Sequence, residues 1–231
     1  IPLNETNIDT IAERIADSGF ESVAVSLLFS FLHPAHEEAI REALTRRLGA
    51  DVPVSLSSVV LPEFREYERT STTVLNAYVA PVVGRYVSRL RSELPNSIRI
   101  FSSSGGSLTA GETIERPVQM LLSGPAGGVT GAFAIAQAVG VEQVITFDMG
   151  GTSTDVALCP GEIPRTNEGE IAGLPVRLQT VDIWTVGAGG GSIAQVDAGG
   201  ALEVGPRSAG ADPGPAAYGK GTEPTVTDAN V

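Results

Sequence analysis

The sequence contains a single cysteine, Cys159, among 231 residues. Within this chain an intrachain disulfide and a metal site built from several cysteines are therefore excluded, and such usage is compatible with a reducing cytoplasm. Basic residues are also scarce, because 15 Lys and Arg stand against 27 Asp and Glu, giving a formal net charge of −12. Surfaces that bind nucleic acid or anionic lipid are basic, so we expect neither kind of partner.

Long hydrophobic runs are missing as well. The longest, residues 23–32, contains two serines, whereas a helix needs roughly 20 apolar residues to cross a bilayer. We therefore expect no transmembrane segment and a cytoplasmic protein. The chain opens at Ile1 without Met, and residues 227–231 resemble the start of a helix that Asp228 would cap. These ends favour a piece of a longer polypeptide, whose functional site would be incomplete.

Glycine is distributed unevenly, and this divides the chain into two parts. Three of the 27 glycines lie in residues 1–104 and the other 24 lie in residues 105–231. In the first part, helices are predicted over residues 8–16, 34–48 and 67–94, and strands over residues 22–29, 52–56 and 98–102. Helices that alternate with buried strands are typical of an α/β layer with parallel pairing. The second part is expected to consist of short strands and turns, with a loop over residues 205–224.

The sharpest motif is a diglycine turn between two predicted strands, residues 144–148 and 153–158. Its candidate site residues are Asp148, Gly150, Gly151, Thr152, Ser153, Thr154 and Asp155. Glycines let backbone N–H groups approach an anion, and the three hydroxyls add donors for phosphate oxygens. Asp148, at a strand end, suits Mg²⁺ held through water beside a phosphate. An ordinary β-hairpin with a polar turn accounts for the same pattern, and both interpretations stay open.

Two further glycine-rich segments are candidates for nucleotide binding. Residues 123–128, with Gly127 and Gly128, precede an Ala-rich helix, whose N-terminus would offer free N–H groups and a positive dipole end. A helix packed closely on a sheet through small residues is the alternative. The segment at residues 186–192 contains Gly187, Gly189, Gly190, Gly191 and Ser192. It would wrap a nucleotide or form a structurally neutral loop.

Three other groups carry weaker functional interpretations. His33, His36 and Glu37 would suit a metal ion, but such residues at a helix start are more often capping and solvated. The charged run at residues 63–69 is interpreted as a solvated helix face. Cys159 is expected to be buried rather than a nucleophile, since no histidine lies near it in the sequence.

Five segments together resemble the hydantoinase/oxoprolinase family, which includes ATP-dependent N-methylhydantoinase A subunits, 5-oxoprolinases and acetone-carboxylase β-type subunits. The matching stretches are LPEFREYER at residues 61–69, LSGPAGG at 122–128, FDMGGTSTDV at 147–156, VGAGGGSIA at 186–194 and AGADPGPAAY at 209–218. They follow the family's order from residue 61 onward. A co-linear set of this kind is far more specific than any one of its members.

The resemblance implies an α/β chain with an incomplete actin-like ATPase (ribonuclease H-like) fold, with mixed sheets and flanking helices. In that superfamily two related halves each present a glycine- and threonine-rich hairpin to the phosphates of ATP. Residues 1–104 would be the rear of the first half, without its hairpin. Residues 105–231 would start the second half, with its hairpin at residues 147–155. The resemblance further implies that Asp148 holds Mg²⁺ or orients water and that Asp155 is a second polar anchor. It also implies that the glycine-rich segment at residues 187–192 lines the nucleotide or the substrate.

The implied activity is the ATP-driven opening of a cyclic amide, in which phosphorylation of the amide oxygen eases the attack of water on the carbonyl carbon. The implied partners are a cyclic-amide substrate and a hydantoinase B-type subunit or domain, and a homo-oligomer is compatible with both. This length of chain by itself is expected to be inactive. Two alternatives stay open: a carboxylase-type subunit that uses ATP on a ketone or bicarbonate, and a non-catalytic nucleotide-binding scaffold.

The chain departs from the family pattern at three positions. Trp184 stands where the family commonly has His, and Ala217 stands where it commonly has Cys. Ser104 stands where an Asn often precedes the two glycines. If the missing His or Cys serves chemistry in relatives, this chain differs in substrate or has lost activity, which favours the scaffold alternative.

Overall fold

The computed structural model describes residues 4–94, 96–171 and 173–231, and the chain forms two compact units. Unit 1 comprises Ile1–Gly124 and Arg165–Thr180, and unit 2 comprises Pro125–Pro164 and Val181–Val231. Helices and strands occur in both units, so the predicted mixed α/β class is confirmed. The division predicted between residues 104 and 105 concerns the halves of a larger ATPase, and it stays a prediction.

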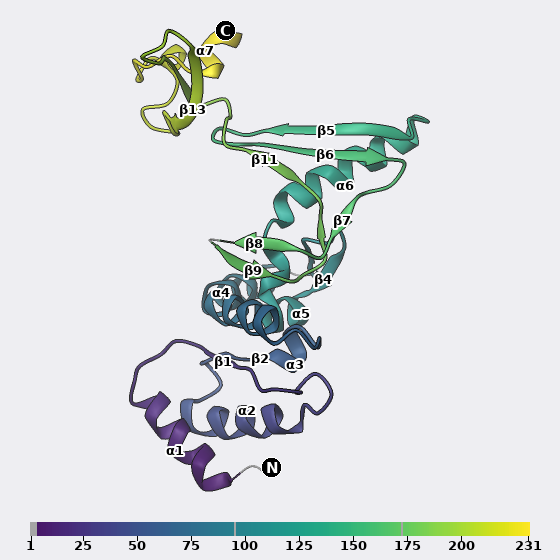
Figure 1. Ribbon diagram of the computed structural model, residues 1–231, viewed down its shortest axis with the longest axis vertical. Helices are drawn as coiled ribbons and strands as arrows, with labels where there is room; N and C mark the ends of the chain where they lie inside the picture. Colours follow the sequence, from purple (N-terminus) through teal and green to yellow (C-terminus); the bar gives the residue numbers. More distant parts are fainter. Residues whose placement is uncertain (1–3, 95, 172) are drawn as a thin grey trace. The chain divides into compact units, whose positions relative to one another are not determined.

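Unit 1 is built around a short parallel strand pair covered by helices. Its first elements are α1 (Glu5–Ala16), β1 (Val23–Val25), α2 (Ala35–Leu48), β2 (Val54–Leu56), α3 (Ser57–Val60) and α4 (Glu66–Glu93). β1 and β2 pair in parallel, as predicted, with α1 and α2 on one side and α4 on the other (Figure 1). Gly49, at a φ of 85°, ends α2 in a backbone conformation that favours glycine. The core between these elements contains Ala12, Val25, Leu44 and Leu56.

The third predicted strand does not join this pair. The following elements are β3 (Arg99–Phe101), β4 (Ser107–Thr109), α5 (Ala110–Glu115) and the 3-10 helix η1 (Pro117–Met120). β3 pairs antiparallel with β4 in a separate two-stranded sheet. The prediction of one parallel layer is therefore wrong for this strand, because so short a connection between strands permits only a hairpin.

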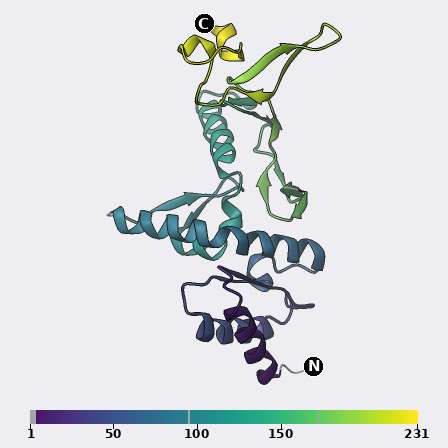
Figure 2. The same cartoon turned by 90° about the vertical axis from the view of Figure 1, so that its left-hand side faces the viewer.

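The long helix α4 also packs against residues 165–180, the segment by which the chain returns from unit 2 to unit 1 (Figure 2). The strands of that segment are β7 (Arg165–Thr166), β8 (Gly169–Ile171) and β9 (Leu174–Val176). Val176 and Leu178 pack with Leu75 of α4 and Val118 of η1 in one buried cluster. Although α4 is long, neither it nor any other helix in the described ranges is apolar enough to cross a membrane.

Unit 2 contains a three-stranded sheet and a separate hairpin. Its elements are α6 (Ser123–Ala138, from Pro125 onward), β5 (Gln143–Met149), β6 (Thr154–Pro160), β10 (Thr180–Val181, at the unit boundary), β11 (Trp184–Val186), β12 (Ser192–Val196), β13 (Leu202–Ser208), the 3-10 helix η2 (Ala216–Tyr218) and α7 (Val226–Asn230). The sheet has the order β11-β6-β5, and β12 pairs antiparallel with β13. The loop predicted over residues 205–224 is wrong in part, because β13 extends to Ser208 and η2 forms within it.

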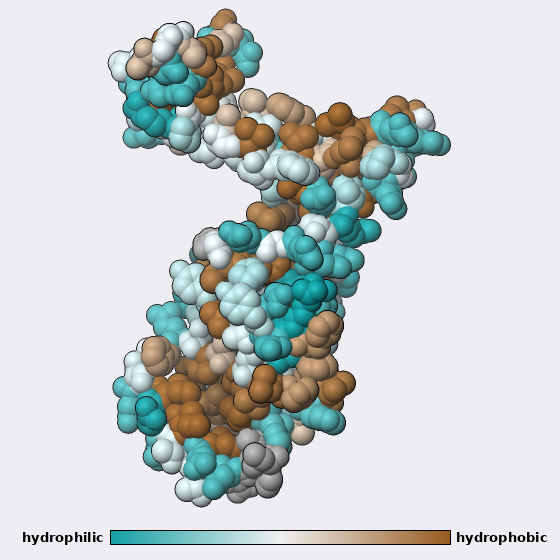
Figure 3. Space-filling view, in the orientation of Figure 1, coloured by the Kyte–Doolittle hydropathy of each residue, from teal (hydrophilic) through white to brown (hydrophobic). Residues whose placement is uncertain are grey.

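The two faces of the three-stranded sheet differ. Ala126, Val129 and Phe133 of α6 pack against Ala157 and Cys159 of β6 in one buried cluster. The alternate residues of the hairpin are exposed instead, including Ile145, Phe147 and Leu158. Hydrophobic surface accordingly gathers over the β5–β6 hairpin (Figure 3). The face of the sheet that packs on α6 is therefore the buried one, and it fixes the position of the hairpin that carries the candidate site.

Candidate nucleotide-phosphate site

The diglycine turn closes the antiparallel hairpin of β5 and β6. Met149 pairs with Thr154, and Asp148 pairs with Asp155 one step further from the turn. The N–H of Gly150 donates to the carbonyl oxygen of Ser153 across the turn, at 2.9 Å. The predicted strand–turn–strand arrangement of this motif is therefore confirmed. The alternation of the strands also places both aspartates on the same face as Ala157, which packs against α6.

The two aspartates at the hairpin rim are directly opposite each other. Like charges in this position destabilise a strand pair unless something offsets them. Asp155 accepts a hydrogen bond from the Thr185 hydroxyl of β11 at 2.6 Å. Asp148 is exposed, and its Oδ2 lies 3.3 Å from the place that a β-carbon on Gly128 would occupy. The absent side chain of Gly128 thus leaves α6 close to this carboxylate, and a cation beside the pair would relieve its repulsion.

The glycine loop before β12 packs directly on the diglycine turn. Gly190 N–H donates to the carbonyl oxygen of Gly150 at 2.8 Å, and Gly191 N–H donates to that of Gly151 at 2.7 Å. A β-carbon on Gly191 would lie 2.9 Å from the Gly151 oxygen. Backbone contacts this close require glycine. The loop at residues 187–192 therefore packs specifically on the candidate site, and the interpretation as a structurally neutral loop is wrong.

The hydroxyl groups of two predicted phosphate ligands bind protein groups: Thr154 joins the hairpin to the glycine loop, and Ser192 closes the loop on itself. The Thr154 hydroxyl donates to the carbonyl oxygen of Ala188 at 2.6 Å. The Ser192 hydroxyl accepts from Gly189 N–H at 2.9 Å. Thr154 and Ser192 are both buried, whereas Thr152 is exposed at the tip of the turn. Among the candidates with hydroxyl groups, Thr152 is therefore the one most open to a ligand.

The amides at the tip of the turn point to a candidate ligand site. Within the described part of the chain, no acceptor is found for the N–H groups of Gly151 and Thr152, and both residues are exposed. Successive N–H groups in a glycine-rich turn form a concavity that binds anions. The donor set therefore fits phosphate oxygens, and the neighbouring carboxylates Asp148 and Asp155 are ligands of the kind that Mg²⁺ prefers. No group of three or more His, Cys, Asp or Glu side chains suited to a metal is found among the described residues, so a metal here would need ligands from phosphate and water.

A cleft of about 400 Å³ opens on this turn, entirely within unit 2. Its lining residues are Met149, Gly150, Gly151, Gly190, Gly191, Gly210, Pro215, Tyr218, Thr227 and Asn230. The Thr227 hydroxyl and N–H both donate to the carbonyl oxygen of Gly190, at 2.8 and 2.9 Å. The turn is thus open to a ligand rather than packed shut. The wall formed by η2 and α7 was missed as a site by sequence reasoning, although residues 209–218 match a family segment.

Asp228 joins the two elements of this wall. It occupies the third position of α7 in a capping box whose N-cap is Thr225, so it does contribute to a cap, as its place in the sequence suggested. Its carboxylate also accepts from the N–H groups of Ala217, at 2.6 Å, and Ala216, at 3.3 Å. The hydrogen bond from Ala217 N–H and that from the Thr225 hydroxyl lower the pKa of Asp228 below its usual 3.8. The carboxylate is therefore charged at neutral pH.

The histidine-containing group at α2 is not a metal site. Glu37 is fully buried, and its carboxylate accepts from Leu27 N–H at 2.8 Å, the Ser57 hydroxyl at 2.7 Å and Ser58 N–H at 2.8 Å. Burial alone would raise its pKa, but these hydrogen bonds outweigh burial and leave the pKa lowered. Glu37 is therefore an internal anchor of unit 1, whereas His33 and His36 are exposed.

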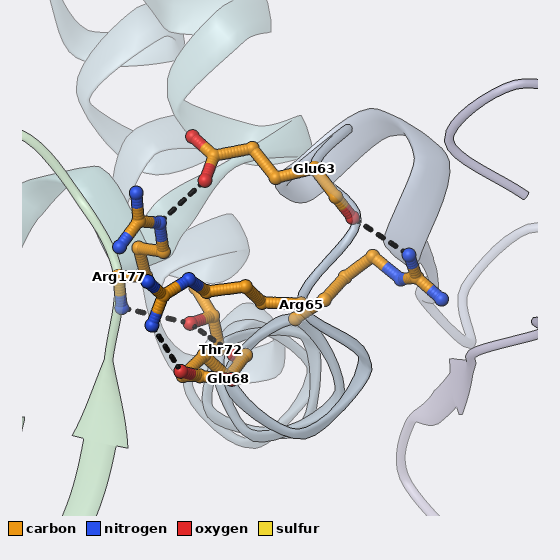
Figure 4. A network of polar contacts seen from close by, with 6 residues as sticks. Glu63, Arg65, Glu68, Thr72 and Arg177 are labelled. Carbon is orange, nitrogen blue, oxygen red and sulfur yellow. Dashed lines mark hydrogen bonds and ion pairs between the residues drawn. The ribbon is translucent and has the colours of Figure 1, made fainter. Parts of the chain in front are cut away.

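The charged run at residues 63–69 is only partly solvated. Arg69 is 1% exposed, and its guanidinium donates to the carbonyl oxygens of Glu63, at 2.7 Å, and Leu27, at 2.8 Å. The Glu63 carboxylate pairs with Arg177 of the returning segment, and Arg65 pairs with Glu68 at 3.1 Å (Figure 4). The prediction of a solvated face is therefore wrong for Arg69, because this side chain fixes two loop backbones.

Cys159 is fully buried in the cluster beneath α6, as predicted. Burial raises the pKa of its thiol. A thiol that stays protonated is a poor nucleophile, so its role is packing.

The fold and the cleft define a mixed α/β protein with a glycine-rich cleft. Two family models match the chain: "Hydantoinase/oxoprolinase" over residues 69–231 and "Hydantoinase/oxoprolinase N-terminal region" over residues 1–48. The chain therefore belongs to the hydantoinase/oxoprolinase family, as the five sequence segments indicated.

Relatives of known name support this assignment. Caprolactamase subunit alpha of Pseudomonas jessenii is 43% identical over all of this chain, which covers 34% of that protein. The 5-oxoprolinase of Saccharomyces cerevisiae is 37% identical over 99% of the chain, which covers 18% of it. The chain thus spans 34% and 18% of the length of these two relatives.

Solved structures of the family share the architecture. The crystal structure of ATP-dependent caprolactamase from Pseudomonas jessenii matches with a TM-score of 0.80 and 42% identity, over 99% of this chain and 34% of that one. The nucleotide-free structure of acetone carboxylase, which performs ATP-dependent acetone carboxylation, matches with a TM-score of 0.73 and 31% identity, over 91% and 31%. Enzymes whose names state ATP dependence are therefore among the structural relatives.

Proposed function

We propose that this chain carries one phosphate-binding half of an ATP-dependent hydrolase that opens cyclic amides, within an actin-like ATPase fold. The observation that carries the proposal is the diglycine turn, where the amides of Gly151 and Thr152 find no acceptor among the described residues and two opposed aspartates pair at the ends of the flanking strands. Relatives named caprolactamase and 5-oxoprolinase, enzymes of cyclic amides by name, support this substrate class.

In this proposal the backbone of the turn and the glycine loop form the phosphate cradle. The assigned cradle residues are Gly150, Gly151, Thr152, Ser153, Thr154, Gly187, Gly189, Gly190, Gly191 and Ser192. Gly128 brings the N-terminal turns of α6, which also contain the assigned Gly127, near the Asp148 carboxylate, where the helix dipole favours negative charge. Two donors of the cradle, the amides of Gly151 and Thr152, find no acceptor among the described residues. Because the turn holds these amides in place, they need no rearrangement as charge develops on the phosphate.

Asp148 is assigned to the metal and Asp155 to positioning. Asp148 is exposed and carries no protein hydrogen bond within the described ranges, so its oxygens are available. Mg²⁺ bound there would neutralise phosphate charge. Asp155 is held by Thr185 at 2.6 Å and so keeps a fixed orientation opposite Asp148. The metal would therefore lie on the side of the turn that carries the two aspartates.

The proposed reaction overcomes the low reactivity of an amide. Transfer of the terminal phosphoryl group of ATP to the amide oxygen removes the resonance that protects the carbonyl carbon. Water then attacks that carbon, and the ring C–N bond breaks as the nitrogen takes a proton, which leaves an acyl phosphate. A second water hydrolyses the acyl phosphate, so that ATP and two waters yield ADP, inorganic phosphate and the open-chain amino acid. The chain supplies backbone N–H groups that stabilise the phosphoryl group during its transfer. A second half of the cleft and a hydantoinase B-type partner belong to the proposal, since the relative from Pseudomonas is named as a subunit.

The match to acetone carboxylase favours a second candidate, a carboxylase-type subunit that activates a ketone or bicarbonate with ATP. A scaffold without catalysis would follow if Trp184 and Ala217 mark lost chemistry. Phosphate release by the full-length protein with its partner, measured with 5-oxoproline, caprolactam, hydantoin, or acetone plus bicarbonate, separates these candidates. We expect stimulation by a cyclic amide. Stimulation only by acetone plus bicarbonate would support the carboxylase, and binding of Mg-ATP without any stimulated release would support the scaffold.

A further inference from the structure

Tyr218 is the one aromatic residue among the described residues that line the cleft. This residue lies at the end of η2 and is 68% exposed. An exposed aromatic ring beside a polar cleft provides a large flat surface at little conformational cost. The ring is therefore available to a ligand that already contacts the diglycine turn.

The backbone around Tyr218 is held in place on both sides. Gly214 has a φ of 76°, and a β-carbon there would lie 3.6 Å from Cδ2 of the tyrosine ring. Tyr218 N–H donates to the carbonyl oxygen of Pro215 at 3.0 Å, which closes the turn of η2. The tyrosine ring thus lies beside Gly214, and the hydrogen bond of η2 fixes the backbone from which the ring projects.

The Asp228 carboxylate fixes this turn to α7. It accepts from Ala217 N–H at 2.6 Å and from the Thr225 hydroxyl at 2.7 Å. Thr227, one residue earlier, donates to the carbonyl oxygen of Gly190 in the glycine loop at 2.8 Å. A continuous chain of hydrogen bonds therefore ties the platform to the phosphate cradle, so that both are preorganised for one ligand.

We propose that Tyr218 is the stacking platform for the purine ring of the nucleotide whose phosphates lie on the Gly150–Thr152 turn. This inference rests on the proposed function. Gly150 and Gly151 of the turn and Tyr218 line the same cleft of about 400 Å³, and sites for small ligands commonly enclose about 300–1,000 Å³. Stacking on an aromatic ring does not depend on the identity of the base, so GTP is expected to gain from Tyr218 as ATP does.

The test compares two ligands on the full-length protein by calorimetry, each with Mg²⁺: a non-hydrolysable ATP analogue and inorganic tripolyphosphate. Loss of one stacked base weakens binding about 5- to 150-fold. Tyr218→Ala should therefore weaken binding of the analogue by that factor and leave tripolyphosphate unchanged. Tyr218→Phe should retain both affinities, because the ring is kept. Tyr78→Ala removes a tyrosine that is 79% exposed on α4 and should change neither.

The outcomes separate this inference from the function on which it rests. If Tyr218→Ala binds the analogue as the wild type does, the platform is wrong and the phosphate cradle stands. If the variant loses both ligands equally, the ring supports the wall rather than a base, and the inference is overturned. If the wild type binds neither ligand, the proposed function itself fails.

A second variant keeps the inference testable if Tyr218→Ala does not fold. The substitution Tyr218→Trp adds an indole at this position, and the fluorescence difference between this variant and Tyr218→Phe in the full-length protein reports that indole alone. The ATP analogue should quench this fluorescence and tripolyphosphate should not. A signal that the analogue leaves unchanged, although calorimetry shows binding, would overturn the stacking platform.

Discussion

Gly189 lies so close to Gly150 that the two backbones leave no room for a side chain between them. A β-carbon on Gly189 would lie 2.6 Å from the carbonyl oxygen of Gly150 and 2.8 Å from the Ser153 nitrogen. Both neighbours are backbone atoms, which cannot turn aside as a flexible side chain would. The contact joins two glycine-rich segments, which the sequence keeps apart, into the floor of one cleft.

Gly189→Ala should therefore separate the loop from the turn. We expect a loss of about 1–3 kcal/mol of stability, typical of overpacking, and weaker binding of Mg-ATP. Urea unfolding and calorimetry on the full-length protein measure the two effects. Gly131→Ala is the matched control, because a β-carbon there meets no atom within 4 Å and alanine favours the helix α6. Equal stability of the Gly189 variant and the wild type would contradict the close packing.

Asp148→Ala should leave the fold intact and suppress ATP hydrolysis about 10²- to 10³-fold, as expected when a group that stabilises transition-state charge is removed. The side chain is exposed and lies outside the core, so the melting temperature should hardly change. The control is Glu142→Gln, which removes an exposed acid just before β5. Wild-type turnover in the Asp148 variant would remove this residue from the mechanism.

Glu37→Gln should destabilise unit 1. The carboxylate accepts three hydrogen bonds at full burial, and the neutral amide can accept at only one of its two terminal atoms. Hydrogen bonds to charged groups contribute about 1.5–3 kcal/mol each, so we expect a loss in at least that range. Denaturant unfolding of this variant beside Glu38→Gln, an exposed neighbour on the same helix, gives the comparison. Similar losses in both variants would refute the anchoring role.

The stability of the protein should also fall in acid through Glu37. Its pKa is lowered from the usual 4.5 in the folded state, so the folded protein binds this proton less readily than the unfolded chain. The contribution is therefore fully present above pH 4.5 and is lost as the pH falls through the lowered pKa. The stability difference between wild type and Glu37→Gln, measured by unfolding from pH 7 to pH 3, should narrow at the acid end. A constant difference would contradict the assignment.

The hairpin of the candidate site was predictable because its signals are local. The alternation of β5 and β6 and the two glycines between them specify a strand–turn–strand unit. The contacts that complete the site are not local: Thr227 reaches Gly190, 37 residues away. Likewise, Glu37 resembles a solvated residue at a helix start because Ser57 lies 20 residues further along the chain. Sequence patterns identify elements, whereas burial of a polar residue depends on which elements meet.

The most direct test of the phosphate cradle uses Gly151, which lines the cleft and has an exposed amide. A β-carbon there would meet no protein atom within 4 Å, so Gly151→Ala should fold normally and place a methyl group in open space at the turn. Calorimetric titration of the full-length protein with Mg²⁺ and a non-hydrolysable ATP analogue should show affinity weakened roughly tenfold or more, at an unchanged melting temperature. Unchanged affinity in this folded variant would show that the nucleotide binds elsewhere.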